Sequence, residues 1–537
     1  RVLADPTVQS VTLITSRERL YESGVDVNFY ALKGLKESAW QQFFTIRQIK
    51  GSVTAFSQMW QAFGGNAKAM QIISGVIVTD FDGNADVYWR ENRDDLLIER
   101  ELEHLVSSQF ERLEQMDKEA YKLLCRLGCY RYQDINHVGV QGLQCLLWDV
   151  PELQSKRVIK SLFDRLLIEY RKGKYWLHPV ICTEAIARLK QSGEWEIANR
   201  KAAEFWNTSV TKIEDHQNAL TALEAYHHYM EIGDFEQAAN VIIQGRQNKW
   251  DNVLSLGVLF TRLGLLETLI AVINPLIENL QSECYLSILY NILGRAYHQI
   301  GNISMAIDCH HRASEISTQC DFFQEKVSSI FNLGLCYVDL WEVERAKYIL
   351  QSVKKLVANQ KNYYQYVVYS LCCLAYLESS IGHHDHVTSM LAEIHKGLLN
   401  HRLTSWGRGV SLLFISLTYK NLGQIETALE SCNQAITHCQ NNGFSFLEAR
   451  GISCLASLYR EQGEFAVAIN KHQEAIASMS KVSDKCNLAK AYYQLGLTYQ
   501  RIGDIKESQD NFNRAIALFH EMPAPKQVEK VMMVMSK

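Results

Sequence analysis

A unit of about forty residues is repeated six times in the second half of the chain. The turn position of this unit is occupied in order by Gly301, Trp341, Gly382, Gly423, Gly463 and Gly503. Successive turn positions are 40 or 41 residues apart, and a tyrosine lies four residues before five of the six. A sequence that repeats with this period predicts stacked copies of one small structural unit, since each copy buries its apolar face only against its neighbours.

The residue types around the turn position indicate a pair of antiparallel helices in each unit. A glycine, an alanine or a serine stands seven residues before the turn and lets two helix backbones approach closely. Glycine at the turn itself accepts the left-handed backbone that joins one helix to the next. Trp341, at the glycine position, and Glu378, at the tyrosine position, depart from the pattern, so we expect their two units to turn or pack differently.

This pattern resembles the tetratricopeptide repeat in its longer form. The resemblance implies a mostly α chain in which residues 281–537 form a right-handed α-solenoid. Weaker copies of the pattern around Gly233 and Gly264 predict degenerate helix pairs over residues 206–280. The apolar residues of 526–537 have helical spacing, which predicts a helix that caps the last unit.

In the family that the pattern resembles, the first helix of each unit lines a groove that binds a protein or peptide. On those helices this chain carries Asn291, Arg295, His298, Lys420, Arg450, Arg460, Lys490 and Arg501. Lys420, Arg460 and Arg501 make this face of the last units basic, which suggests a partner that carries carboxylates. The alternative is that these residues are ordinary solvated surface charges.

The composition is that of an ordinary folded, soluble protein. Hydrophobic residues make up 47% of the chain, and no apolar run reaches the roughly 18 residues that a membrane span needs. The net charge of -4 gives no basic surface for nucleic acid or for a membrane. The 14 cysteines are scattered along helical stretches with no signal peptide before them, so we expect reduced thiols and a cytoplasmic location.

Two other stretches suggest sites, but each has a simpler explanation. His383-His384-Asp385-His386 is dense in metal ligands, yet it falls at a turn, where polar residues are expected, and we predict no metal site. The helix expected over 154–167 carries four basic residues, while leucine and isoleucine fill most of its other positions. Binding of DNA through this helix is therefore the weaker alternative.

The first third of the chain combines one strand with short helices. Residues 11–15 are β-branched or apolar and predict a buried strand, whereas the apolar spacing over 25–95 predicts helices. Within 96–205, two β-prone runs flank Arg171-Lys172-Gly173-Lys174, which indicates a hairpin, and a further helix follows. Helices followed by a two-stranded wing predict a winged-helix domain.

These elements, in this order, resemble the later part of a bacterial STAND-type ATPase with an NB-ARC core. Thr15-Ser16-Arg17 matches the end of the sensor strand in that family, which implies that Arg17 meets the terminal phosphate of the nucleotide. The stretch that begins at Gly65 stands where the family has Gly-Leu-Pro-Leu-Ala against the adenine, with Ala67 in place of the proline. His178 in Leu-His-Pro matches the histidine that contacts the β-phosphate of ADP in some members.

The chain lacks the parts that such an ATPase needs for catalysis. No Gly-x-x-x-x-Gly-Lys-Ser/Thr loop occurs, and no apolar strand ends in paired acids that would hold magnesium. We therefore predict that this chain is not an enzyme and holds no cofactor by itself. By the resemblance, the intact protein binds ADP or ATP with Mg. We expect this chain to be a fragment in which residues 1–24 are the remnant of the nucleotide-binding core; the alternative is a natural descendant that lost the phosphate loop.

The resemblance implies a regulatory function. An ADP-locked switch would open and self-assemble when the solenoid captures a protein cue. The alternative function is a passive scaffold that assembles other proteins on its groove. Retention of bound nucleotide distinguishes the switch from the scaffold, because only the switch needs to retain ADP.

Overall fold

The computed structural model describes residues 34–93, 100–251, 253–399, 403–481 and 484–536. The chain divides into two compact units, one made of residues up to 209 together with 220–234, and one made of residues 210–219 together with 235–537. The strand predicted over 11–15, and with it Arg17, lies outside the described residues.

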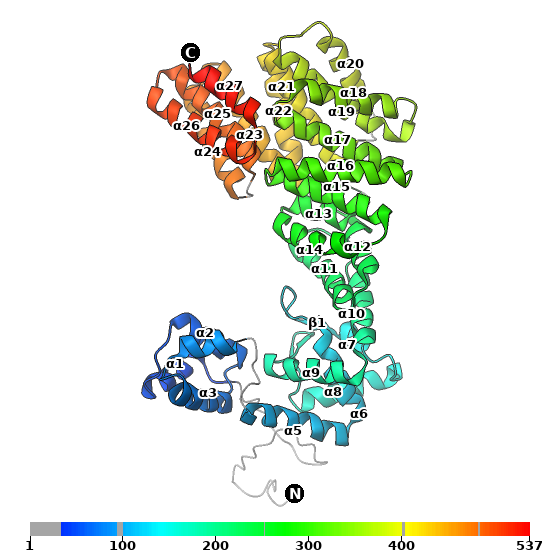
Figure 1. Ribbon diagram of the computed structural model, residues 1–537, viewed down its shortest axis with the longest axis vertical. Coiled ribbons are helices and arrows are strands. Elements are labelled where there is room, and N and C mark those ends of the chain that lie inside the picture. Colours follow the sequence, from blue (N-terminus) through cyan, green and yellow to red (C-terminus); the bar gives the residue numbers. More distant parts are fainter. Residues whose placement is uncertain (1–33, 94–99, 252, 400–402, 482–483, 537) are drawn as a thin grey trace, which may run out of the picture. The chain divides into compact units, whose positions relative to one another are not determined.

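The first unit begins with four short helices around an aromatic core. They are α1 (Glu37–Ile46), α2 (Val53–Ala62), α3 (Ala67–Asp80) and α4 (Ala85–Asn92) (Figure 1). Ser52, Asn66 and Asn84 start the last three of these helices, because their side chains accept hydrogen bonds from N–H groups of the first turn. Trp40 and Phe44 of α1 are fully buried in the shared core. The short helices predicted in this part of the chain are therefore present.

A larger helical part with a small sheet completes the first unit. Its elements are α5 (Arg100–Met116), α6 (Lys118–Arg126), the 3₁₀ helix η2 (Leu127–Cys129), β1 (Val138–Gly139), α7 (Val140–Gln144), α8 (Glu152–Asp164), β2 (Glu169–Arg171), β3 (Lys174–Trp176), α9 (Pro179–Ser192), α10 (Trp195–Ser209) and α11 (His216–Glu231). The strands pair antiparallel in the order β1, β3, β2. Lys172 and Gly173 have φ of 50° and 81°, as a two-residue hairpin turn requires. The predicted wing is thus present.

The second unit opens with a sheet that the sequence did not indicate. Its strands are β4 (Lys212–Ile213), β5 (Gly245–Asn248) and β6 (Val253–Ser255), and β5 pairs parallel with β4 and antiparallel with β6. The helices predicted on either side of Gly233 and Gly264 are present, but the prediction missed these strands, because strands of two to four residues are too short for an alternating pattern to show. The helices of this stretch that belong to the second unit are α12 (Phe235–Ile243), α13 (Leu256–Leu263) and α14 (Leu266–Asn279).

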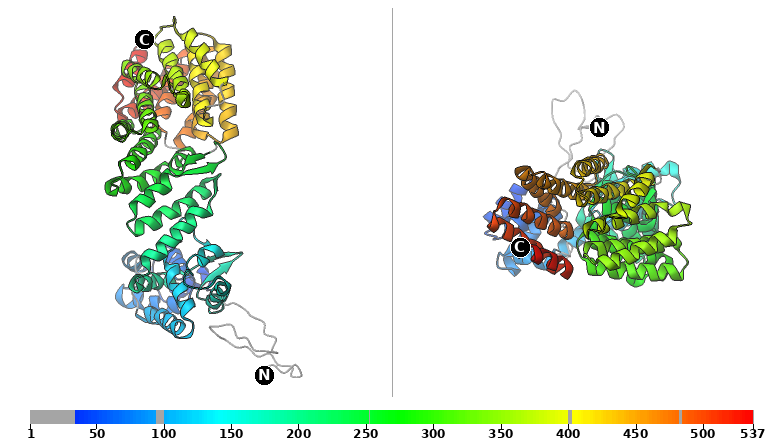
Figure 2. Two further views of the ribbon diagram at one scale, coloured as in Figure 1. Left: turned by 90° about the vertical axis from the view of Figure 1, so that its right-hand side faces the viewer. Right: turned by 90° about the horizontal axis from the view of Figure 1, so that it is seen from above.

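Regular helix pairs follow and confirm the predicted mostly α solenoid. They are α15 (Glu283–Gln299) with α16 (Ile303–Gln319), α17 (Phe323–Asp339) with α18 (Val343–Val357), η3 (Lys361–Tyr363) and α19 (Tyr364–Ser380) with α20 (Val387–Leu399), α21 (Ser405–Asn421) with α22 (Ile425–Asn442), α23 (Ser445–Glu461) with α24 (Phe465–Lys481), and α25 (Lys485–Ile502) with α26 (Ile505–Glu521). The five turn glycines have φ between 76° and 84°, the left-handed backbone that glycine adopts without strain. Seen from above in Figure 2, these pairs follow an arc.

The two units that depart from the repeat pattern differ in packing more than in their turns. Trp341 has a φ of 62°, so the backbone turns here as it does at the glycines, and the expected difference is one of packing. What differs is the surroundings of its ring, because the Lys530 ammonium lies 3.6 Å from the ring centroid. Glu378 forms an ion pair of 2.9 Å with Lys347 and lies 3.2 Å from His383. Both departures therefore coincide with side-chain contacts that the other units lack.

The last helix, α27 (Pro525–Met535), caps the solenoid as predicted. Its Val528 and Val531 pack into the core that Phe512 and Phe519 of α26 form. None of the helices in the described ranges is both long and apolar enough to cross a membrane. All 14 cysteines are free, and the described side chains contain no group of three or more His, Cys, Asp or Glu arranged to hold a metal ion.

Candidate functional site

The concave side of the second unit holds a cavity of about 540 Å³, called the larger cavity below. Residues of α13, α15, α17, α19, α21, α23 and α25, the first helices of the successive pairs, supply most of its lining. The repeat sets this geometry, because the first helix of every pair faces the same side of the stack.

A chain of amide and carboxylate groups lines one wall of the larger cavity. Asn291 of α15 donates from Nδ2 to Glu325 at 2.6 Å and to the Ser328 hydroxyl at 3.0 Å. Asn332 donates to the Asn291 carbonyl oxygen at 3.0 Å. Burial raises the pKa of Glu325, although the Asn291 hydrogen bond and the Arg295 charge work against this rise. The side chains on this wall therefore satisfy one another.

Arg295, one turn after Asn291 on α15, lacks the hydrogen-bond partners that the other polar side chains of this wall have. Its guanidinium lines the larger cavity and forms no hydrogen bond or ion pair with any described residue. Burial, and next the neighbouring Arg262, lower the pKa of Arg295. A buried guanidinium without a partner is costly, and an anion in the cavity would remove that cost.

Aromatic rings form another part of the lining. The rings that line the larger cavity belong to Phe322, Phe331, Tyr366, Tyr369, Trp406, Phe414 and Phe446. Tyr366 and Tyr369 of α19 lie edge to face with a centroid distance of 6.0 Å, and Tyr369 shares a hydrogen bond of 3.2 Å with Thr404. A cavity that combines fixed rings with a few cations binds ligands that carry both an apolar part and a negative charge.

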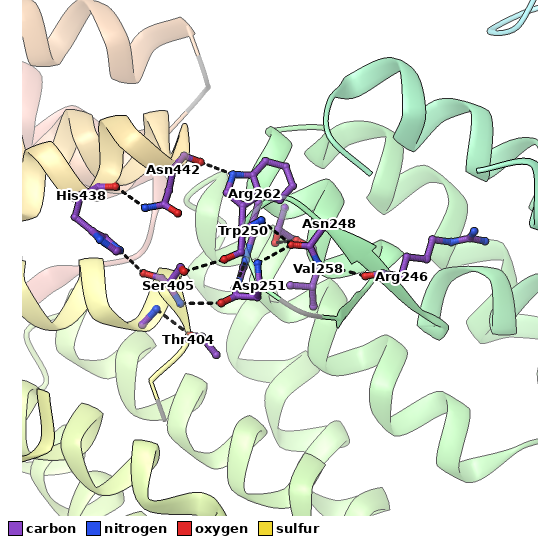
Figure 3. A network of polar contacts seen from close by, with 12 residues as sticks. Arg246, Asn248, Trp250, Asp251, Val258, Arg262, Thr404, Ser405, His438 and Asn442 are labelled. Carbon is purple, nitrogen blue, oxygen red and sulfur yellow. Dashed lines mark hydrogen bonds and ion pairs between the residues drawn. The ribbon is translucent and has the colours of Figure 1, made fainter. Parts of the chain in front are cut away.

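The segment between β5 and β6 fixes the edge of this cavity by reaching across to α21 and α22 (Figure 3). Asp251 accepts a hydrogen bond of 2.9 Å from the Ser405 N–H, and Ser405 donates from its hydroxyl to the Trp250 carbonyl at 2.8 Å. The indole N–H of Trp250 donates to the carbonyl oxygen of Asn442. Residues more than 150 positions apart in the sequence are joined in this way.

Arg262 belongs to the same network and shows how a compensated arginine is held. Its guanidinium donates to Asp251 at 2.6 Å and lies 5.9 Å from the Trp406 ring centroid. The Arg262 side chain is almost completely buried, and its charge is balanced by the Asp251 carboxylate. It therefore helps to build the wall, whereas Arg295 next to it has no such role.

A smaller cavity of about 130 Å³ adjoins the larger one, and the two share Asp339, Phe414, Arg450 and Asn487 in their linings. Four cations from four different helices line it: Lys420 of α21, Arg450 of α23, Lys490 of α25 and Lys530 of α27. Asp339 is the one carboxylate in this lining.

Asp339, at the end of α17, is the centre of the contacts here. Its carboxylate accepts from Lys490 and is hydrogen-bonded to His298 at 2.8 Å, while its backbone oxygen accepts from Gln527 at 2.8 Å. Although burial alone would raise the pKa of Asp339, the Lys490 and His298 charges hold that pKa well below its usual range. Residues of α15, α17, α25 and α27 thus meet at one carboxylate.

The residues predicted for the groove fall into two groups. Asn291, Arg295, His298 and Arg450 line the larger cavity, and Lys420, Arg450 and Lys490 line the smaller one. Arg460 and Arg501 belong to neither lining. Arg460 donates to the Gln494 side chain at 2.9 Å and pairs with Glu461 at 3.0 Å, and the exposed Arg501 lies 3.8 Å from Glu461.

Sequence reasoning missed Lys530 and the aromatic lining. Lys530 lies in the capping helix, outside the repeat pattern, so its position relative to Lys420 does not follow from the period. The signal that could have found it is Trp341, because a large ring at a glycine position needs a partner elsewhere in the fold. The ammonium of Lys530 is that partner.

In the first unit, His178 lies against the turn that precedes α3. Its Nδ1 accepts from the Val180 N–H at 3.3 Å, and its other ring nitrogen bonds the Phe63 backbone oxygen. A Cβ added at Gly64, where φ is 57°, would meet His178 Nε2 at 2.0 Å. Burial lowers the pKa of His178, and the Phe63 hydrogen bond opposes this shift. Burial therefore favours the neutral imidazole in this contact.

The other residues that the family resemblance assigned to nucleotide lie nearby in the chain. Gly65 is buried and its carbonyl accepts from the Leu35 N–H at 2.7 Å, whereas Ala67 is exposed at the start of α3. Arg17, the fourth residue of this set, lies outside the described residues. The assignment of the set to a nucleotide therefore stays a prediction.

Comparisons with known proteins agree with the repeat and with the fold. Residues 410–442 and 447–521 match models of the tetratricopeptide repeat. The fold is similar to that of a Signal Transduction ATPase with Numerous Domains (STAND) protein with a tetratricopeptide repeat sensor from Pyrococcus horikoshii, at 16% identity, over 94% of this chain and 73% of that chain, with a TM-score of 0.50. The chain thus contains tetratricopeptide repeats, and its fold resembles that of a STAND protein.

Two further matches cover less of this chain. The Rap conjugation gene regulator of the plasmid pLS20, in complex with the Phr* peptide, is 12% identical over 76% of this chain and 97% of that chain, with a TM-score of 0.43. An uncharacterized WD repeat-containing protein of Nostoc sp. is 26% identical over 239 residues, which are 41% of this chain. This match spans only 18% of the length of the Nostoc protein.

Proposed function

We propose that this chain is the sensing part of a STAND-type regulatory protein and that its concave surface captures a protein or peptide with negative charge. The observation that carries this proposal is a set of cations on that surface that form no ion pair with a carboxylate. Arg295 and Arg450 line the cavities without a hydrogen bond or ion pair to any described residue. The fold similarity to a STAND protein with a repeat sensor supports the regulatory context.

Cations that line a concave surface carry an electrostatic cost that an anionic partner removes. Cations held near one another on a concave surface repel, and partial burial removes the water that would screen them. A fold gains nothing from this arrangement by itself, whereas an acidic partner gains charge-assisted hydrogen bonds and a higher association rate. The surface therefore suits a partner that brings carboxylates or other anionic groups.

We propose further that the first unit relays binding to a nucleotide-dependent switch in the intact protein, while this chain itself is not catalytic. ADP or ATP with Mg would be held there together with parts outside this chain, and the family resemblance assigns Arg17, Gly65, Ala67 and His178 to that site. The contact between His178 and the Phe63–Gly64 turn supports a relay, because it ties α9 to the turn before α3. Activation by this route would include self-assembly.

A displayed library of random peptides tests the binding function. Peptides selected on the chain should be rich in Asp and Glu, and their affinity should fall at least about tenfold in R295M. The control is R345M, because Arg345 is an exposed arginine on the second helix α18. Binders without acidic residues, or equal binding by R295M, would contradict the proposal.

The nucleotide part has a separate test in a protein that includes the phosphate loop. The switch predicts ADP that stays bound through purification and is lost in H178A. Retention that is unchanged in H178A, or no retention at all, favours a passive scaffold on which the concave surface only assembles partners.

A further inference from the structure

The smaller cavity has far more positive than negative charge. Its lining contains Lys420, Arg450, Lys490 and Lys530, but Asp339 is its single carboxylate. The Asp339 carboxylate is already engaged by Lys490 and His298. Arg450 acts on this carboxylate only through its charge, and Lys420 and Lys530 have no carboxylate of their own in the lining.

Lys530 shows the imbalance most clearly. Its ammonium forms no hydrogen bond or ion pair with the described residues and lies 3.6 Å from the Trp341 ring centroid. Burial, and next the charges of Lys490 and Lys420, lower the pKa of Lys530 to about 8. An ammonium in this position is stabilised by any anion that enters the cavity.

Lys420 faces the same space from α21. Its ammonium donates to the Ser457 hydroxyl at 3.1 Å, which is a neutral acceptor. Burial, and next the charge of Arg460, lower the pKa of Lys420. Since Lys420 has three N–H donors, donors remain for a ligand.

We propose that the smaller cavity binds the phosphate group of a phosphorylated ligand, with Lys420, Arg450 and Lys530 as its cationic partners. A phosphate monoester carries about −1.5 to −2 charges near pH 7 and offers three acceptor oxygens, whereas a carboxylate brings a single charge. The phosphate therefore matches both the number and the convergence of the cations. This inference rests on the proposed function, since it names the anionic group that the concave surface recognises.

The rest of the ligand would extend into the larger cavity. The two cavities share Asp339, Phe414, Arg450 and Asn487, so a ligand with its phosphate among the lysines can reach the aromatic lining. A phosphorylated small molecule and a phosphorylated side chain of a peptide both supply this chemistry. The test below separates these two sources.

Isothermal titration calorimetry of the whole chain with inorganic phosphate, at constant ionic strength, tests the proposal. We expect saturable binding to the wild-type chain that weakens at least about tenfold in K420M and in K530M. The matched control is K526M, because Lys526 lies on the same helix as Lys530 but is exposed and pairs with Glu529 at 3.5 Å. Circular dichroism melting of each variant shows whether it is folded.

Two further arms use glucose 6-phosphate and a pentapeptide with a central phosphoserine. Tighter binding of the sugar phosphate identifies a small-molecule ligand, and tighter binding of the phosphopeptide identifies a protein partner; either result supports the site when K530M weakens it. No saturable binding of inorganic phosphate, or binding that K420M and K530M leave unchanged, overturns the inference. Acidic peptides that still bind through Arg295 in that case would leave the proposed function standing.

Discussion

Arg126 in the first unit is a fully buried arginine on a helix and Arg295 in the second a half-buried one, and their surroundings are opposite. Arg126 donates to Asp149 at 2.6 Å and 2.9 Å, to Glu194 at 2.8 Å and 3.0 Å, and to the Leu146 carbonyl at 2.9 Å. Its guanidinium also lies 3.7 Å from the Trp148 ring centroid. Arg295 has none of these partners. The difference separates a cation that the fold uses from a cation that is left for a ligand.

The pKa shifts of the two arginines express the same contrast. Burial alone would lower both, but the hydrogen bonds from Arg126 to Asp149 and Glu194 raise its pKa overall. For Arg295, burial and the charge of Arg262 leave the pKa lowered. A ligand anion in the larger cavity would balance the charge of Arg295 and raise its pKa, as Asp149 and Glu194 do for Arg126.

The largest loss of stability is expected when Arg126, the arginine with ion-pair partners, is replaced. R126M leaves Glu194 without its cation and Asp149 with Lys122 alone, and it should lower the free energy of unfolding of the first unit by about 3–5 kcal/mol. Urea unfolding followed by tryptophan fluorescence measures this, because Trp148 lies directly under the guanidinium. R157M is the control, since Arg157 is a mostly exposed partner of Asp117 and Glu119, and it should cost no more than about 1 kcal/mol. A similar cost for both variants would break the comparison.

The second largest effect is a pH dependence of stability. It extends the comparison to a buried imidazole of the solenoid that also lacks a hydrogen-bond partner. Both nitrogens of His472 on α24 are without a hydrogen bond in the described structure, and burial lowers its pKa to about 3. Below about pH 6.5 the unfolded chain binds a proton at this residue and the folded chain does not, so stability should fall as pH falls, by about 1.4 kcal/mol per unit.

The measurement is the free energy of unfolding between pH 7 and pH 5 for the wild type and H472L. The variant should lose less stability than the wild type as the pH falls, and the accumulated difference between pH 7 and pH 5 should be about 2 kcal/mol. Equal slopes would mean that His472 is protonated in the fold and has a partner after all.

The third effect concerns the contact between His178 and the turn before α3. In G64A the new Cβ would stand 2.0 Å from His178 Nε2, at a residue whose φ of 57° already disfavours alanine. We expect a loss of about 1–2 kcal/mol in the free energy of unfolding, measured in urea. G75A is the matched control, because nothing lies within 4 Å of its new Cβ inside α3, and it should gain about 0.5–1 kcal/mol. No loss in G64A would argue against a fixed contact here.

The local pattern of residues in the sequence predicted much of this fold. The turn glycines, the capping helix α27 and the hairpin around Gly173 were visible because each depends on residues close together in the sequence. The sheet of β4, β5 and β6 was not, since its strands are very short and β4 pairs with a strand more than 30 residues later.

The site was predictable only in part, for the same reason. The repeat places Lys420, Arg450 and Lys490 on first helices, and the sequence alone named all three. The sequence did not show that Arg460 hydrogen-bonds Gln494 and pairs with Glu461, because the contact with Gln494 depends on how the next helix pair packs. Nor could it bring Lys530 to Trp341, which requires the capping helix to meet the end of α17 in space.

The most direct test of the account is the free energy of unfolding of R295M/R450M without any ligand, measured in urea beside R126M. If these two arginines are held for a ligand, the double variant should be as stable as the wild type or more stable, while it loses acidic peptides. A loss of stability close to that of R126M would contradict the account, because the two arginines would then be part of the fold.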